Sequence, residues 1–86
     1  MPSVEEVKLH VGASIQLAET ASLGIRGVLE RLDESLARLQ ITTVGSVHPN
    51  AAQALVRMEA ARTQLLEAET LMRGAIDAAD QYRAVI

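Results

Sequence analysis

Residues 41–50 read ITTVGSVHPN, and this stretch divides the chain into two long helical patterns. It contains two threonines, a glycine and a proline, but no Asp, Glu, Lys or Arg. Pro49 suits the first turn of a following helix, because a proline there removes no helical hydrogen bond. Ser46 or His48 is then expected near the N-cap of that helix. The stretch therefore predicts a connection between two helices, with the turn over residues 41–49.

A seven-residue repeat of apolar and small residues precedes this connection. Ser3, with Glu6 three positions later, matches a capping box at a helix start, and the repeat predicts a helix over residues 3–40. The first row of the repeat consists of Val4, Val11, Ala18, Ile25, Leu32 and Leu39. The second row consists of Val7, Ser14, Ala21, Val28 and Ser35, and the stripe is widened on one side by Ile15, Leu29 and Leu36.

The residues after the connection carry the same repeat and predict a helix over residues 50–84. One row consists of Ala51, Met58, Leu65, Met72, Ala79 and Ile86, and the other of Ala54, Ala61, Ala68, Ala75 and Tyr82. Helices joined by a short connection are antiparallel neighbours. We therefore expect an all-α fold, a single antiparallel two-helix hairpin over residues 1–86. With Gln40 facing Asn50, the small residues of the second rows face each other, as in an alanine-rich coiled coil.

Four glycines lie inside the predicted helices: Gly12, Gly24, Gly27 and Gly74. Each costs about 1 kcal/mol relative to alanine in a helix interior. One interpretation is the close approach of another helix, or simple tolerance. The alternative is a bend or flexible segment around Gly24 to Gly27.

Several large apolar side chains exceed what one hairpin can bury, and exposed apolar surface on this scale marks an interface. We expect a homodimer that forms a four-helix bundle, although a partner protein could cover the same surface. Tyr82, the single aromatic residue, is expected to pack against Val7 or a second chain. The expected interface residues are Leu9, Leu17, Leu23, Leu66, Leu71 and Tyr82.

The sequence contains no pattern typical of catalysis or cofactor binding. His10 and His48 are the only histidines, and they fall at opposite ends of the predicted hairpin, whereas a zinc site needs three or four convergent ligands. The carboxylates lie outside the two repeat rows, and several have helical partners: Glu34 with Arg38, Glu69 with Arg73, and Asp80 with Arg83. We expect no enzyme, no catalytic residues, no metal, no cofactor and no small-molecule ligand.

Charge and hydropathy narrow the expected partners further. The net charge is −3, the eight basic residues are dispersed, and one aromatic residue offers no platform for stacking bases, so nucleic acid is not an expected partner. No window approaches twenty apolar residues, and the start MPSVEEVK lacks the basic and apolar regions of a signal peptide. We expect a cytoplasmic protein without a membrane span. Binding to a membrane surface is the weakest hypothesis, because the polar faces have no basic bias.

The layout resembles the WXG family of small helical hairpins. The place of that family's W-x-G turn is taken by Thr43-Val44-Gly45, which has the glycine but not the tryptophan. The place of its Y-x-x-x-D/E export signal is taken by Tyr82 with Ile86, which has the tyrosine but not the acid. The resemblance implies an antiparallel, dimeric hairpin exported by type VII secretion without a classical signal peptide. The main expectation from the residues themselves is a non-enzymatic module that binds another protein.

Overall fold

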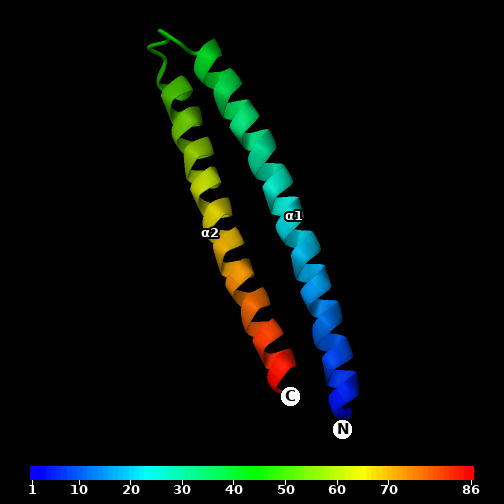
Figure 1. The fold of residues 1–86 in the computed structure, drawn as a ribbon. Coiled ribbons are helices and arrows are strands. Elements are labelled where there is room, and N and C mark those ends of the chain that lie inside the picture. Colours follow the sequence, from blue (N-terminus) through cyan, green and yellow to red (C-terminus); the bar gives the residue numbers. More distant parts are fainter.

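The protein is an antiparallel pair of long helices in a computed structural model that describes residues 1–86. Helix α1 spans Val4–Thr42 and helix α2 spans Pro49–Val85. They lie side by side in opposite directions, and both chain termini are at the end opposite the turn (Figure 1). The prediction of an all-α, two-helix hairpin is confirmed.

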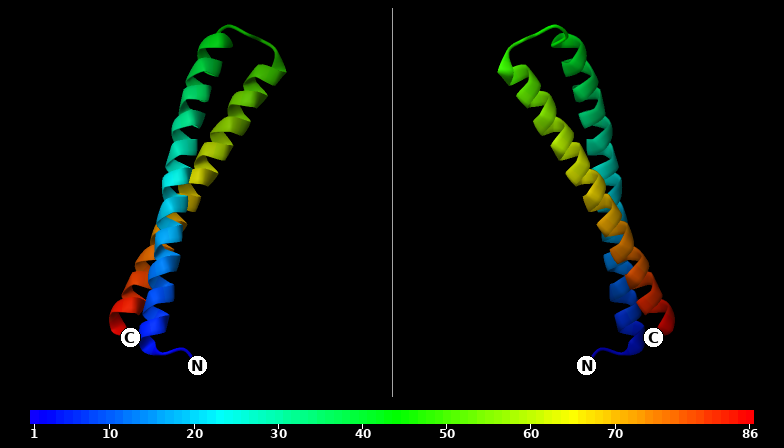
Figure 2. Two further views of the ribbon diagram at one scale, coloured as in Figure 1. Left: turned by 90° about the vertical axis from the view of Figure 1, so that its right-hand side faces the viewer. Right: turned by 90° about the vertical axis from the view of Figure 1, so that its left-hand side faces the viewer.

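The hairpin is long and thin. It measures 64 × 18 × 15 Å and has a Cα radius of gyration of 19.4 Å. A compact domain of this length would have a radius of gyration of about 12 Å. The helices cross each other obliquely along their length (Figure 2). Each helix therefore meets only one neighbour, and most of its circumference faces solvent.

Both helix starts are capped by side chains. The Ser3 hydroxyl accepts a hydrogen bond from the Glu6 N–H at 3.1 Å, which confirms Ser3 as the cap of α1. Of the two residues expected to cap the second helix, His48 does so: its Nδ1 accepts a hydrogen bond from the Asn50 N–H at 3.1 Å. Pro49 follows at the first helical position, where it removes no hydrogen bond.

Helix α1 ends at Thr42, two residues beyond the predicted end. The Thr42 and Thr43 hydroxyls donate hydrogen bonds to the carbonyl oxygens of Arg38 and Leu39, both at 2.7 Å. The helix thus includes Ile41 and Thr42, two β-branched residues that read as part of the connection, and the Thr43 N–H still bonds to the Leu39 carbonyl at its end. The chain then reverses at Gly45, whose φ of +77° favours glycine.

The rows of the repeat that meet between the helices differ from those expected. The first row of α1 is mostly half-buried, but from Ser14 to Ser35 the second row is exposed. The buried positions lie on the other flank of the first row and are Ile15, Ser22, Leu29 and Leu36, joined by Ile76 of α2. In α2, Ala61 and Ala75 are likewise exposed. The prediction that the small residues of the second rows face each other within one hairpin is wrong. Large aliphatic side chains bury more apolar area than alanine and serine do, so they occupy the seam.

Three of the four helix-interior glycines do not mark close packing inside the hairpin. A Cβ atom added at Gly24, Gly27 or Gly74 would meet no atom within 4 Å, whereas one added at Gly12 would lie 3.2 Å from Nη1 of Arg83. Helix α1 is assigned as helical without a break past Gly24 and Gly27. At these two positions, therefore, nothing within the hairpin requires glycine.

Alanine substitutions at the glycines should separate backbone strain from helix propensity. We expect Gly45→Ala to lower the free energy of unfolding by about 1 kcal/mol, because alanine is strained at positive φ. Gly74→Ala should raise it by about 0.5–1 kcal/mol, because alanine restricts the unfolded chain and fits an open helical site. Urea unfolding followed by circular dichroism measures both changes. A neutral Gly45→Ala would contradict the positive-φ turn.

Candidate protein-interaction surface

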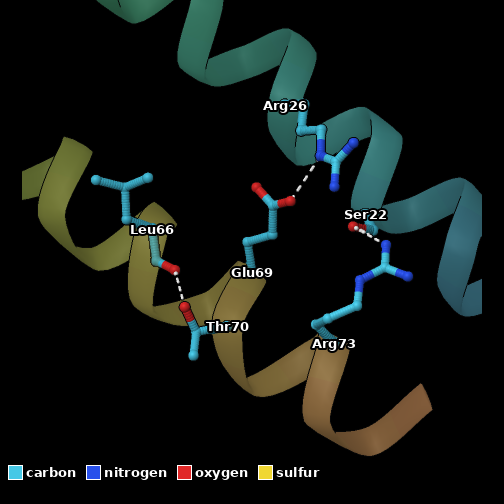
Figure 3. A network of polar contacts seen from close by, with 6 residues as sticks. All are labelled: Ser22, Arg26, Leu66, Glu69, Thr70 and Arg73. Atoms are coloured by element: carbon cyan, nitrogen blue, oxygen red, sulfur yellow. Dashed lines mark hydrogen bonds and ion pairs between the residues drawn. The ribbon is translucent and has the colours of Figure 1, made fainter. Parts of the chain in front are cut away.

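One long side of the hairpin carries the polar contacts between the helices. Arg26 Nε and Glu69 Oε1 are 2.6 Å apart, and Arg62 Nε and Asp33 Oδ1 are also 2.6 Å apart. Nearby, Nη2 of Arg73 donates a hydrogen bond to the Ser22 hydroxyl at 3.3 Å. Figure 3 shows Arg26 and Ser22 on α1 facing Glu69 and Arg73 on α2. We call this side the ion-paired face.

These contacts revise one of the three ion pairs expected from helical spacing. Glu34–Arg38 and Asp80–Arg83 form as predicted. The predicted pair of Glu69 with Arg73 does not form: Glu69 pairs with Arg26 of the other helix and Arg73 bonds to Ser22. Glu69 lies at the seam with its side chain only 18% exposed, so its charge is offset by the guanidinium that reaches across to it.

The cross-helix contacts also show how the two helices are aligned. Arginine side chains on a helix extend toward the N-terminus of that helix. Arg26 and Arg73 therefore each reach back about one turn, the former to Glu69 and the latter to Ser22. This geometry puts Ser22 level with Glu69, close to the alignment expected with Gln40 facing Asn50.

The opposite long side of the hairpin carries no carboxylate, and we call it the carboxylate-free face. When two antiparallel helices have the same repeat positions in the seam, each other repeat position falls on the same side of the hairpin in both helices. The second rows of both helices, and the rows four positions before them along the repeat, therefore share this face. On α1 they comprise Val7, Ser14, Ala21, Val28 and Ser35, with His10, Leu17, Gly24, Arg31 and Arg38. On α2 they comprise Ala54, Ala61, Ala68, Ala75 and Tyr82, with Arg57, Gln64, Leu71, Ala78 and Val85.

All six residues predicted for an interface are exposed, but they do not form one face: Leu17 and Leu23 share one surface depression, and Leu66 and Leu71 share another. Leu17, Leu71 and Tyr82 belong to the carboxylate-free face and are 73%, 75% and 47% exposed. Leu9 and Leu23 lie fourteen residues apart on the outer side of α1, away from the seam. Leu66, the least exposed at 41%, lies beside the ion-paired face (Figure 3).

Sequence reasoning missed the other members of the carboxylate-free face. Val28 and Val85 are exposed there beside the small residues. The sequence signal is the placement of charge. None of the eleven acidic residues falls on these four rows, and the three arginines that do lie toward the turn. This pattern becomes visible only when it is known which of the two rows beside the first row faces the other helix.

The surface depressions are shallow and open to solvent. One lies along α1 beside Leu17 and Leu23, and another lies along α2 beside Leu66 and Leu71. Histidine, aspartate and glutamate side chains nowhere gather in a group of three or more that could bind a metal ion. Neither helix contains a segment long and apolar enough to cross a membrane. The extended apolar surface is thus the feature on which a functional argument can be built.

Comparisons with protein-family models, with curated proteins and with solved structures gave no match.

Charge reversal should test the ion-paired face. We expect Arg26→Glu and Glu69→Arg each to destabilise the protein by up to about 1 kcal/mol, because each puts two like charges across the seam. The double variant should recover most of this loss. Thermal unfolding at low and high salt gives the coupling energy. The matched control is the Glu34–Arg38 pair, which lies within one helix and should give about 0.3–0.5 kcal/mol. No coupling between positions 26 and 69 would contradict the observed contact.

Proposed function

We propose that this protein is a non-enzymatic protein–protein interaction module, a helical hairpin that dimerises into a four-helix bundle. The observation that carries the proposal is the small extent of the core. Five of the 86 residues are buried. A pair of helices with no other neighbour leaves part of the apolar surface of each helix exposed to solvent. Most helical stability in proteins comes from packing apolar helix faces against one another.

The accessible surface supports association of the chain with a partner. The hairpin exposes 6475 Å². A compact monomer of this mass would expose about 4,900 Å², which leaves an excess of about 1,500 Å². A standard protein interface buries only about 800 Å² per partner. The excess surface is therefore sufficient for a stable dimer.

A homodimer is favoured over a single foreign helix because the exposed apolar residues follow both helices. Leu17 and Val28 lie on α1, and Leu71, Tyr82 and Val85 lie on α2. Another two-helix unit covers both at once, and a second copy of this chain supplies one. The bundle so formed still presents Leu9, Leu23 and Leu66 on its outer surface, where a different protein could bind.

Size measurement tests the proposal directly. Light scattering coupled to size exclusion should give twice the 9.2 kDa chain mass. The unfolding temperature should rise with protein concentration, because association stabilises the folded chain by mass action. A chain that remains monomeric at high concentration and unfolds cooperatively at a concentration-independent temperature would exclude the dimer.

The partner-binding part of the proposal needs its own measurement. Leu9→Ser and Leu23→Ser should leave the dimer intact, because both residues lie away from the carboxylate-free face. They should reduce the recovery of proteins that co-purify with the wild-type chain from its native host. Equal recovery by both variants and the wild type would remove the outer surface as a binding site.

A further inference from the structure

We propose that a second copy of this chain docks on the carboxylate-free face in an antiparallel orientation, with the turn of each hairpin over the open end of the other. This inference rests on the proposed dimer and adds the surface, the orientation and the residues at the two-fold axis. In this arrangement α1 packs on α1 of the second copy, and α2 packs on α2.

The choice of face follows from charge. A dimer through the ion-paired face would bury Glu69, Asp33 and their arginine partners, and removing charges from water is costly even for paired groups. The carboxylate-free face has no acid to desolvate. Its three arginines are on the outer rows, where long side chains can keep their charged ends in water.

The same arginines decide the orientation. In a parallel dimer, α1 of one copy would lie over α2 of the other at equal levels. Arg31 and Arg38 would then lie on either side of Arg57 of the second copy, and their like charges would repel. The two-fold symmetry would create this repulsion twice. In the antiparallel dimer Arg31 meets the level of His10, and Arg57 meets that of Ala78. No arginine faces another arginine.

Side-chain volumes favour the antiparallel orientation as well. Centring the dimer on Ala21 sets Val7 opposite Ser35, and Ser14 opposite Val28. Centring α2 on Ala68 sets Tyr82 opposite Ala54. Each larger residue of the inner rows thus meets a small one, the pattern that allows helices to interdigitate closely.

The outer rows repeat this complementarity. Leu17 of one copy lies at the level of Gly24 of the other, which gives a role to a glycine that nothing within the hairpin explains. Leu71 meets Gln64. In the parallel orientation, by contrast, Val7 of one copy would meet Tyr82 of the other. Elsewhere small residues would face small residues, which would leave gaps along the interface.

The two centres lie close to one level of the hairpin, as a single two-fold axis requires. The arginine contacts place Ser22 level with Glu69, and because the helices are antiparallel, Ala21 and Ala68 lie one residue, about 1.5 Å, to opposite sides of that level. The axis therefore lies between the two copies and runs across both helices near this level, so Ala21 and Ala68 each face their own counterpart.

Single cysteines test this geometry, because the chain has no cysteine of its own. Under mild oxidation, Ala21→Cys alone and Ala68→Cys alone should each form a disulfide-linked dimer, since identical residues at the axis bring their Cβ atoms within the roughly 3.5–4.5 Å that a disulfide needs. Ala13→Cys and Ala60→Cys are matched controls on exposed alanines outside this face, and they should remain unlinked. Light scattering of each reduced variant reports whether the dimer is present.

The outcomes separate this inference from the dimer itself. Linkage only in a mixture of Ala21→Cys with Ala68→Cys would show the parallel orientation, and would overturn the inference while leaving the proposed dimer standing. A dimer in which neither position links would show that another face is used, with the same consequence. Monomeric reduced variants, together with a monomeric wild-type chain, would overturn both.

Discussion

Two helices can bury each other along only one narrow seam, and the rest of the structure depends on this constraint. Ile15, Leu29, Leu36 and Ile76 fill that seam, and nothing closes over it on either side. A bundle of three or more helices can surround a core, but a pair cannot. The hairpin therefore remains 64 Å long with most apolar side chains outside the core, and its stability is bound to whatever covers them.

The seam also sorts the remaining residues into faces of different character. On one flank, arginines reach across to Glu69, Asp33 and Ser22, so polar groups are satisfied within the chain. On the other flank the helices carry mainly alanine, serine, valine and leucine with one tyrosine, and the only Lys, Arg, Asp or Glu residues there are three arginines on the outer rows. The charged groups of the first flank are already paired, and covering them with a partner would remove their hydration. The second can be covered at little electrostatic cost, which is the physical basis of the proposed dimer.

The candidate surface was only partly accessible to sequence reasoning. Spacing within a helix identified Glu34–Arg38 and Asp80–Arg83, because partners three or four positions apart meet whatever the tertiary structure. It mispaired Glu69 with Arg73, because the contact with Arg26 depends on the alignment of two distant segments. Excess leucine correctly indicated exposed apolar surface, but it did not show that the six expected interface residues are spread around the hairpin and not gathered on one face.

The sequence by itself determined two helices, a cap at Ser3, a second cap at Ser46 or His48, and a short connection that makes the helices antiparallel. These features follow from local hydrogen bonding, helix propensity and chain length. Only the tertiary structure decided which flank of the first row turns inward. The rows on both flanks repeat every seven residues, so the periodicity alone does not indicate which of them is buried. In α1 the large aliphatic side chains of Ile15, Leu29 and Leu36 bury more apolar area than the serines and alanines of the second row, and that difference in burial fixes how α1 is rotated about its axis.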